Sequence, residues 1–295
     1  MKKVAIYGRY LHDDAIDTCK ELITLLKAKN CEVLVESNFH ALLKQSTIAQ
    51  DLQSFDVLDK SYDLLISIGG DGTVLRAVAH IGEVGIPVIG INTGRLGFLA
   101  TLHKDHLVEA VDALHKGAYT LSKRKLITLT SSQEESHPAP HNFALNEVSV
   151  SRMNTTSMIQ IETKLNKELL TVYWADGLII STPTGSTGYS LSCGGPVISP
   201  DTEAFVITPI APHNLNARPL VIPDHTEIII KVSGREEAFL ASLDNRIASF
   251  PNETVLTLKK ADFTIDLIEL KGQSFIKTIR EKLLWGEDKR NKTIK

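Results

Sequence analysis

A short turn that places one carboxylate between glycines is the most informative chemical feature of the chain. The apolar stretch Leu64 to Ile68 runs into Gly69-Gly70-Asp71-Gly72-Thr73, and apolar residues at helical spacing follow directly, as far as Ile81. The first amides of a helix lack internal partners and attract anions, so this turn suits a phosphate. Asp71 would repel a phosphate unless it holds a cation or accepts a hydroxyl proton, and phosphoryl transfer requires both. A tight turn with Asp71 near the helix start is the simpler alternative.

Two further polar stretches interrupt apolar segments in the second half of the chain. Eight of the twelve residues from Ser181 to Ser192 carry a hydroxyl group. Such hydroxyls, with glycine amides between them, suit sugar hydroxyls, an adenine edge and phosphate oxygens, and a serine-rich surface loop is the alternative. Asn146 and Glu147 lie inside the apolar run Ala144 to Val150. Because adjacent side chains of a strand point to opposite faces, at least one should face a core or a ligand, unless the pair marks a strand end or edge.

Alternating strands and helices must position the first turn. Strands are predicted at residues 3–7, 31–35, 64–68 and 87–91, and helices at 13–29, 71–81 and 104–116. Residues 39–60 show a weaker secondary-structure pattern. A helix is possible at their start, and a loop or a short helix near Gln50. This pattern predicts a parallel sheet covered by helices. A second glycine loop, Asn92 to Phe98, follows the fourth strand. Ligands of such sheets bind beyond the carboxyl ends of the strands, so we expect both loops to face one crevice.

The pattern changes to short alternating strands after Tyr119. These are predicted at residues 126–130, 143–150, 158–162, 169–173, 204–210, 227–232, 238–243, 254–258 and 263–270. They favour a mostly antiparallel domain, a sandwich rather than a barrel, with residues 131–141 as an exposed loop. A final helix, Ser274 to Trp285, could pack on the first domain, and a charged tail, 286–295, should fray. The predicted division is 1–120, 121–271 and 272–295.

Composition excludes several classes of protein. The 295 residues are 43% hydrophobic and 23% charged, which is typical of a globular chain. No apolar run approaches the ~20 residues that span a bilayer, and the N-terminus lacks a signal peptide's apolar core. A net charge of −3 argues against a general nucleic-acid surface. The cysteines, Cys19, Cys31 and Cys193, form no CxxC pair, so we expect reduced thiols. We therefore expect a cytoplasmic protein that binds neither membrane nor nucleic acid.

Common nucleotide, protease and metal motifs are absent from the sequence. There is no GxGxxG, no GxxxxGK[ST], no HExxH and no GxSxG. His103 and His106 lie three residues apart, but no third ligand is evident, which argues against a metal site. His213 lies in a loop, where a structural hydrogen bond is the simpler role.

The polar stretches together resemble bacterial NAD kinase, the ATP/polyphosphate-dependent NAD kinase family. The resemblance rests on GGDGT at 69–73, the NE pair at 146–147, DGLIISTPTGST at 176–187 with Tyr189, Ser190 and Ser192 after it, and PH…RPLV from Pro212 to Val221. These motifs occur in the family's order over nearly the whole chain. An element similar to GGDGT occurs in diacylglycerol kinases and phosphofructokinases, so the combination carries the specificity. A lipid kinase of the diacylglycerol or sphingoid type is the alternative enzyme, and a regulator that binds dinucleotide without turnover is the non-enzymatic one.

The resemblance implies a fold, a reaction and an assembly. Family members have an α/β N-terminal domain and a β-rich C-terminal domain, with the active site between them. They transfer the γ-phosphoryl group of ATP, or a phosphoryl group of polyphosphate, to the 2′-hydroxyl of the adenosine ribose of NAD and so make NADP. They require Mg²⁺ or another divalent cation, and they form homodimers or homotetramers.

It also implies roles for individual residues. Asp71 would be the base or the partner of the magnesium ion, and Gly70, Gly72 and Thr73 would approach the phosphates. Asn146 and Glu147 would hold ribose hydroxyls. Asp176 would reach the nicotinamide end, often of NAD bound to a neighbouring subunit. The adenosine pocket would be lined by Phe98, Thr184, Thr187, Gly188, Tyr189 and Ser192.

The chain departs from the family pattern at two positions. Gly188 stands where alanine is common, which should enlarge the pocket or loosen the turn. Trp174 stands where many relatives have arginine, two residues before Asp176, so contacts of that arginine are not implied here. Preference between NAD and NADH, and feedback inhibition by NADPH, do not follow from the resemblance.

Overall fold

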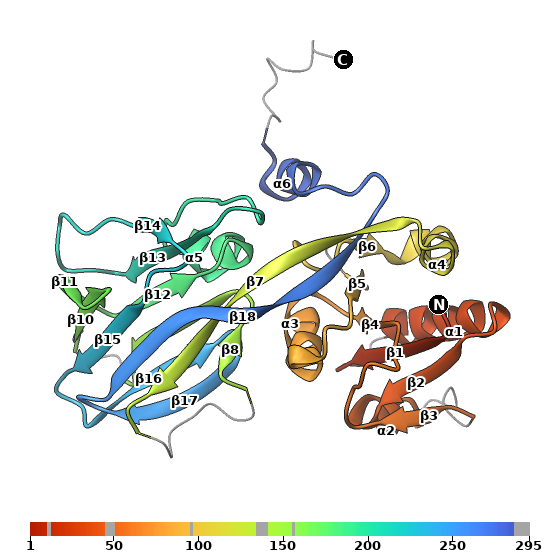
Figure 1. Cartoon of the computed structure of the whole chain (residues 1–295), viewed down its shortest axis with the longest axis horizontal. Coiled ribbons are helices and arrows are strands. Elements are labelled where there is room, and N and C mark those ends of the chain that lie inside the picture. Colours follow the sequence, from red (N-terminus) through yellow and green to blue (C-terminus); the bar gives the residue numbers. More distant parts are fainter. Residues whose placement is uncertain (11–12, 45–50, 95–96, 134–140, 155–156, 286–295) are drawn as a thin grey trace, which may run out of the picture. The chain divides into compact units, whose positions relative to one another are not determined.

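The chain folds into two compact units. The computed structural model describes residues 1–10, 13–44, 51–94, 97–133, 141–154 and 157–285. Unit 1 comprises Met1–Lys123 and the C-terminal segment from Ile265, and unit 2 comprises Arg124–Thr264. The sequence prediction places these divisions after residues 120 and 271. Unit 2 is inserted in the sequence of unit 1, and the long strands β7 (Tyr119–Ser131) and β18 (Val255–Leu270) carry the chain out of unit 1 and back (Figure 1).

Unit 1 is the predicted parallel α/β fold. Its sheet has the strand order β18-β5-β4-β1-β2-β3, with β6 beside β5, and the pairs from β5 to β3 are parallel. The remaining elements are β1 (Lys3–Gly8), α1 (Asp13–Ala28), β2 (Glu32–Glu36), α2 (Ser37–Lys44), β3 (Gln53–Phe55), β4 (Leu64–Ile68), α3 (Asp71–Ile81), η1 (Gly82–Val84), β5 (Val88–Asn92), β6 (Leu102–His103), η2 (Lys104–His106), α4 (Leu107–Lys116) and α6 (Phe275–Leu283). The short strand β3 was not predicted, because Gln53-Ser54-Phe55 shows no apolar alternation. The helix or loop expected near Gln50 falls outside the described residues.

The two faces of this sheet are covered by different helices. Alternate strand residues such as Val4, Ile66 and Ile89 join the apolar stripes of α1 and α4 in one buried cluster. Helix α3 covers the opposite face, because a Cβ atom at Gly90 would lie 2.6 Å from Val74 Cγ2. Gly90 therefore brings the start of α3 close to the sheet.

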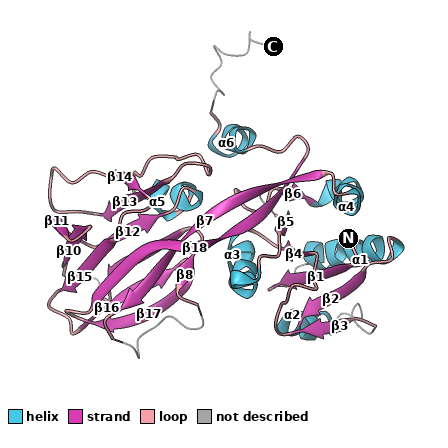
Figure 2. Ribbon diagram, viewed as in Figure 1, coloured by secondary structure: helices cyan, strands magenta, loops and turns pink. Residues whose placement is uncertain are grey.

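Unit 2 contains two antiparallel sheets that share a core, as predicted. One has the strand order β14-β13-β12-β9-β16-β17, and the other contains β11-β10-β15-β18. Figure 2 shows that strands dominate this part of the chain. Its elements are β8 (Phe143–Ala144), β9 (Glu147–Arg152), β10 (Ile159–Leu165), β11 (Glu168–Ala175), β12 (Gly177–Ser181), η3 (Thr184–Thr187), α5 (Tyr189–Ser192), β13 (Ala204–Ile210), β14 (Leu220–Pro223), β15 (Ile228–Ser233), β16 (Ala238–Leu243) and β17 (Arg246–Pro251). Ile161 and Val232 of one sheet and Val148 and Phe205 of the other belong to one buried cluster.

Several predicted strands have different limits in the structure. The run 143–150 is not one strand but two, β8 and β9, with a break at Leu145 and Asn146. The strands predicted at 254–258 and 263–270 form the single strand β18, which begins at Val255. Strands β14 and β17 were missed, since β14 has only four residues and polar Arg246 and Ser249 interrupt β17. Of the predicted loop at 131–141, residues 134–140 lie outside the described residues.

The last described helix, α6, belongs to unit 1 by its contacts. The Ser274 hydroxyl caps it by accepting a hydrogen bond from Lys277 N–H at 3.1 Å, and the helix ends at Leu284, whose φ is +56°. The predicted tail, 286–295, lies outside the described residues. Among the described helices, none has the length and apolar character to cross a bilayer.

Candidate active site

The GGDGT turn forms the start of α3, as predicted. Gly70 is the N-cap residue, in extended conformation, and no side chain caps the helix. The Thr73 N–H closes the first turn on Gly70 O at 2.9 Å. Gly69 has φ +146°, and a Cβ atom there would lie 2.3 Å from Thr73 Oγ1, so only glycine fits. Beside Gly70 and Gly72 the described residues leave open space. Packing against the described residues therefore does not require glycine at these two positions.

Asp71 ties the turn to the second glycine loop. Its Oδ2 accepts the N–H of Phe98 at 2.8 Å, and its Oδ1 accepts those of Leu99 and Ala100 at 3.0 and 2.9 Å. A Cβ atom at Gly97 would lie only 1.7 Å from Asp71 Oδ1, so glycine is required there for the contact. The two loops thus meet, as expected of loops at the carboxyl ends of adjacent strands. Sequence reasoning did not predict that backbone amides would occupy this carboxylate. Residues 95–96 of the loop lie outside the described residues.

Asn146 and Glu147 lie at the break between β8 and β9, where the backbone turns away from regular pairing. Asn146 Oδ1 and Glu147 Oε2 are buried and have no hydrogen-bond partner among the described residues. Burial, and secondarily the charge of Asp244, raises the pKa of Glu147 to about 8, although a hydrogen bond from the Tyr189 backbone acts in the opposite direction. Both side chains therefore present buried polar atoms without a hydrogen bond. Buried polar atoms in proteins are normally hydrogen-bonded, so these two indicate a ligand.

The hydroxyl-rich run is a buried, internally bonded turn rather than a solvated loop. Ser186 Oγ donates to Pro183 O at 2.7 Å and accepts the N–H of Ile198 at 2.9 Å. Ser190 Oγ and Thr208 Oγ1 are 2.8 Å apart. The surface-loop alternative is thus wrong, and several hydroxyls hold the turn itself rather than a ligand.

The candidate ligand residues of this run differ in their exposure. Thr184 is buried, Thr187 and Gly188 are half-buried, and Tyr189 and Ser192 are exposed. A Cβ atom at Gly188 would lie 3.3 Å from Glu147 Oε2 and 3.5 Å from Asn146 Nδ2. Unit 2 therefore brings Gly188 and Tyr189 beside the Asn146-Glu147 pair.

Asp176 is held by an arginine from another strand. Arg152 Nη2 of β9 donates to Asp176 Oδ2 at 2.9 Å, and both side chains are partly exposed. Trp174, at 46% exposure, uses only its backbone, which donates to Asn214 Oδ1 at 3.0 Å and accepts the N–H of His213 at 2.7 Å. The indole of Trp174 is thus not anchored by these bonds, and the cation near Asp176 is Arg152.

Site residues of each unit gather within that unit. Asp71 and Phe98 meet in unit 1, and Asn146, Glu147 and Gly188 meet in unit 2. No group of three His, Cys, Asp or Glu side chains suited to a metal ion occurs in the described ranges. Sequence reasoning missed the residues that support these groups: Gly97, Thr182, Asp244 and Arg246. The turn residues Asp244-Asn245 between two strands were a signal for the last two.

Comparison with known proteins identifies the family. Two family models match, the ATP-NAD kinase N-terminal domain over residues 4–119 and the ATP-NAD kinase C-terminal domain over residues 145–270. The NAD kinase of Christiangramia forsetii is 53% identical over 293 residues, covering 98% of this chain and 100% of that protein. The NAD kinase of Bacteroides fragilis is 40% identical over 291 residues, covering 98% and 99%.

Solved structures share the fold. A yeast NADH kinase complexed with NADH has a TM-score of 0.85 at 24% identity, over 98% of this chain and 89% of that one. An Archaeoglobus fulgidus NAD kinase in complex with ATP has a TM-score of 0.69 at 24% identity, over 91% and 94%. Identity at this level establishes the architecture, and the full-length relatives at 40–53% establish the family. On this basis, the chain belongs to the NAD kinase family.

Proposed function

We infer that the chain is an NAD kinase that phosphorylates NAD to NADP. Within the structure, this inference rests on the two buried acceptors at the β8–β9 break, Asn146 Oδ1 and Glu147 Oε2, which have no partner among the described residues. A ribose diol offers two hydroxyl donors at adjacent carbons, and such a diol would satisfy both. The family assignment selects NAD over the diacylglycerol or sphingoid lipid of the alternative hypothesis.

We assign the adenosine end of NAD to unit 2. Asn146 and Glu147 would hold ribose hydroxyls, and the exposed ring of Tyr189 would offer an aromatic face to the base. Thr184, Thr187, Gly188 and Ser192 would line the same pocket, with Phe98 of unit 1 closing it. Gly188 leaves the space that a methyl group would fill beside Glu147.

Asp71 would act on the 2′-hydroxyl. Its Oδ1 already accepts two amides and its Oδ2 accepts one, so one lone pair of Oδ2 remains for a hydroxyl proton. The amides of Gly70 and Gly72, with Thr73 behind them, would receive donor phosphates at the start of α3. Phosphoryl transfer depends mainly on alignment and charge, so holding acceptor and donor at fixed positions is the larger part of the protein's contribution.

A divalent cation such as Mg²⁺ would accompany the donor. The described residues contain no cluster of ligands for it, and Asp71 has only one free lone pair. This fits a magnesium ion held chiefly by the phosphates, as is usual for nucleotide substrates. When bound, it would neutralise charge on the transferring phosphoryl group.

The donor, the assembly and the location extend this proposal. ATP or polyphosphate would supply the phosphoryl group. Asp176, partly exposed and paired with Arg152, would reach the nicotinamide end of NAD on a neighbouring subunit of a homodimer or homotetramer. A cytoplasmic location agrees with the three free cysteines.

One assay tests the central inference. NADP formation from NAD is followed through an NADP-specific dehydrogenase, with ATP or polyphosphate and with or without magnesium. We expect NADP to form only with a donor and a divalent cation. We also expect Asn146→Ala to raise the KM for NAD more than the KM for ATP. No NADP with either donor would refute the function.

A further inference from the structure

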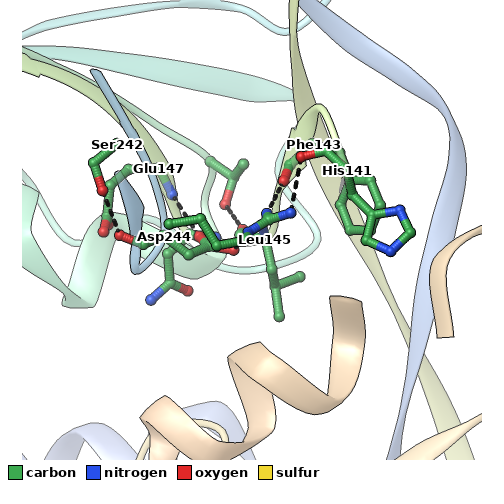
Figure 3. A network of polar contacts seen from close by, with 9 residues as sticks. His141, Phe143, Leu145, Glu147, Ser242 and Asp244 are labelled. Atoms are coloured by element: carbon green, nitrogen blue, oxygen red, sulfur yellow. Dashed lines mark hydrogen bonds and ion pairs between the residues drawn. The ribbon is translucent and has the colours of Figure 1, made fainter. Parts of the chain in front are cut away.

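A buried aspartate at the turn between β16 and β17 faces the Asn146-Glu147 pair. Asp244 begins this turn with φ +53°, a left-handed conformation that aspartate tolerates better than most residues. Its side chain is only 3% exposed. In Figure 3, Asp244 lies against the segment that carries Leu145 and Glu147. A buried carboxylate is costly to maintain, so its bonding partners indicate what it does.

Its carboxylate accepts three consecutive backbone amides. Leu145 N–H donates to Oδ2 at 3.0 Å, and the N–H groups of Asn146 and Glu147 donate to Oδ1 at 2.7 and 3.2 Å. In return, the Asp244 N–H donates to Glu147 O at 2.9 Å. These amides belong to the break between β8 and β9, where regular strand pairing is interrupted. Asp244 therefore holds the backbone of this break in place, where hydrogen bonds between strands do not.

Arg246, two residues after Asp244, donates hydrogen bonds to the same segment. Arg246 is 15% exposed at its side chain, and its Nη1 donates to His141 O at 2.9 Å while its Nη2 donates to Phe143 O. Its Nη2 lies 4.0 Å from Asp244 Oδ2. The aspartate thus holds amides and the arginine holds carbonyls of one segment, residues 141–147.

The remaining carbonyls of the break are also bonded. Thr182 Oγ1 donates to Leu145 O at 2.5 Å, and Thr182 N–H donates to Asn146 O at 2.8 Å. The backbone at the break is thereby held from two sides, while Asn146 Oδ1 and Glu147 Oε2 stay unpaired. We propose that Asp244 is a positioning residue for the NAD site: it fixes residues 145–147 so that these two acceptors meet the ribose hydroxyls. This inference rests on the proposed function, and Asp244 itself contacts only protein.

A purely structural aspartate provides the matched control. Asp224 is also buried in unit 2, at 2% exposure, and pairs with Lys125 at 3.2 Å and Lys260 at 3.0 Å, away from residues 145–147. In Asp244→Asn, the new NH₂ group faces at least one backbone N–H. We expect the KM for NAD to rise by about tenfold, because hydrogen bonds to a charged group are lost at the break. The KM for ATP should stay within about twofold. Asp224→Asn should lower the melting temperature and leave both KM values unchanged.

A double-mutant cycle distinguishes positioning from general loss of stability. If Asp244 acts through the Asn146 side chain, Asp244→Asn should raise the KM for NAD far less in the Asn146→Ala background than in wild type. Fully additive effects, or an unchanged KM for NAD in folded Asp244→Asn, would overturn the proposal. Should that variant not fold, Arg246→Lys replaces it. Lysine lacks the planar fork whose two nitrogens reach the carbonyls of His141 and Phe143 separately, so we expect a smaller rise of the KM for NAD alone. Equal rises of both KM values would count against positioning. A wild-type chain that makes no NADP would instead refute the proposed function.

Discussion

Replacing Asp71 with asparagine separates its chemical role from its structural one. The amide oxygen can keep the hydrogen bonds from Leu99 and Ala100, but the NH₂ group then faces the N–H of Phe98, donor against donor. Loss of one hydrogen bond to a charged group should lower the free energy of unfolding by about 2 kcal/mol. Loss of a general base should lower kcat by about 10²- to 10⁴-fold. The loss of turnover should therefore far exceed the loss of folded protein.

Asp63 is the matched control for this variant. It lies at the opposite end of β4, where its Oδ2 accepts the backbone N–H groups of Lys2 and Lys3. Asp63→Asn should reduce stability without reducing kcat, since the length of β4 separates Asp63 from the GGDGT turn. Chemical unfolding gives the stability of each variant, and the coupled NADP assay gives kcat. Turnover within tenfold of wild type for Asp71→Asn, or an equal loss for Asp63→Asn, would refute the base role.

Three further predictions follow from other residues. Gly188→Ala should change the KM for NAD by less than about threefold. The new Cβ atom would lie 3.3 Å from Glu147 Oε2 and 3.2 Å from Gly185 O, so these neighbours need to move by only a few tenths of an ångström. A tenfold change in this KM would contradict the packing. Folded Glu147 keeps its proton up to a pKa of about 8, whereas the unfolded side chain loses it near 4.5, so the folded state binds more protons between these values. The free energy of unfolding should therefore fall as the pH rises through this interval, and chemical unfolding of Glu147→Gln should lack that contribution. Burial raises the pKa of the Cys19 thiol to about 12, so Cys19 should resist iodoacetamide at pH 8 in the folded protein, while half-buried Cys193 is labelled. Mass spectrometry measures the labelling of each cysteine. Rapid labelling of Cys19 would contradict its buried position.

The spacing of apolar residues predicted most of the fold, because in most elements the apolar residues are those that the tertiary structure buries. Strand β4 and strand β13 have the predicted limits, and the helix after the GGDGT turn begins at Asp71. Their apolar residues recur at the period of the element that they form. The break at Leu145 and Asn146 was not located in this way, because the apolar residues on both sides favour a continuous strand, although the polar Asn146-Glu147 pair offered a strand end as an alternative. The Leu145 amide at this break binds Asp244, which lies about a hundred residues later in the chain.

The candidate site shows the same limit. Motifs located Asp71, Asn146 and Glu147 in the sequence, since their residue types are unusual in their surroundings. They did not reveal that the amides of residues 98–100 bind the Asp71 carboxylate, because backbone groups leave no trace in a sequence. Nor did they separate hydroxyls that hold the turn, such as Ser186, from those that face outward, such as Ser192.

The insertion of unit 2 within unit 1 has a consequence for biosynthesis. The end of β18 pairs with β5 at Leu267 and Val88, and Ile268 joins the core formed by β1, β4 and α1. A ribosome releases this segment only after the whole of unit 2 has been made. Unit 2, a continuous stretch, can complete its core while the chain is still growing. The N-terminal α/β unit must instead wait with the Val88 end of strand β5 unpaired on this side, which makes it the part that depends on protection from aggregation during translation.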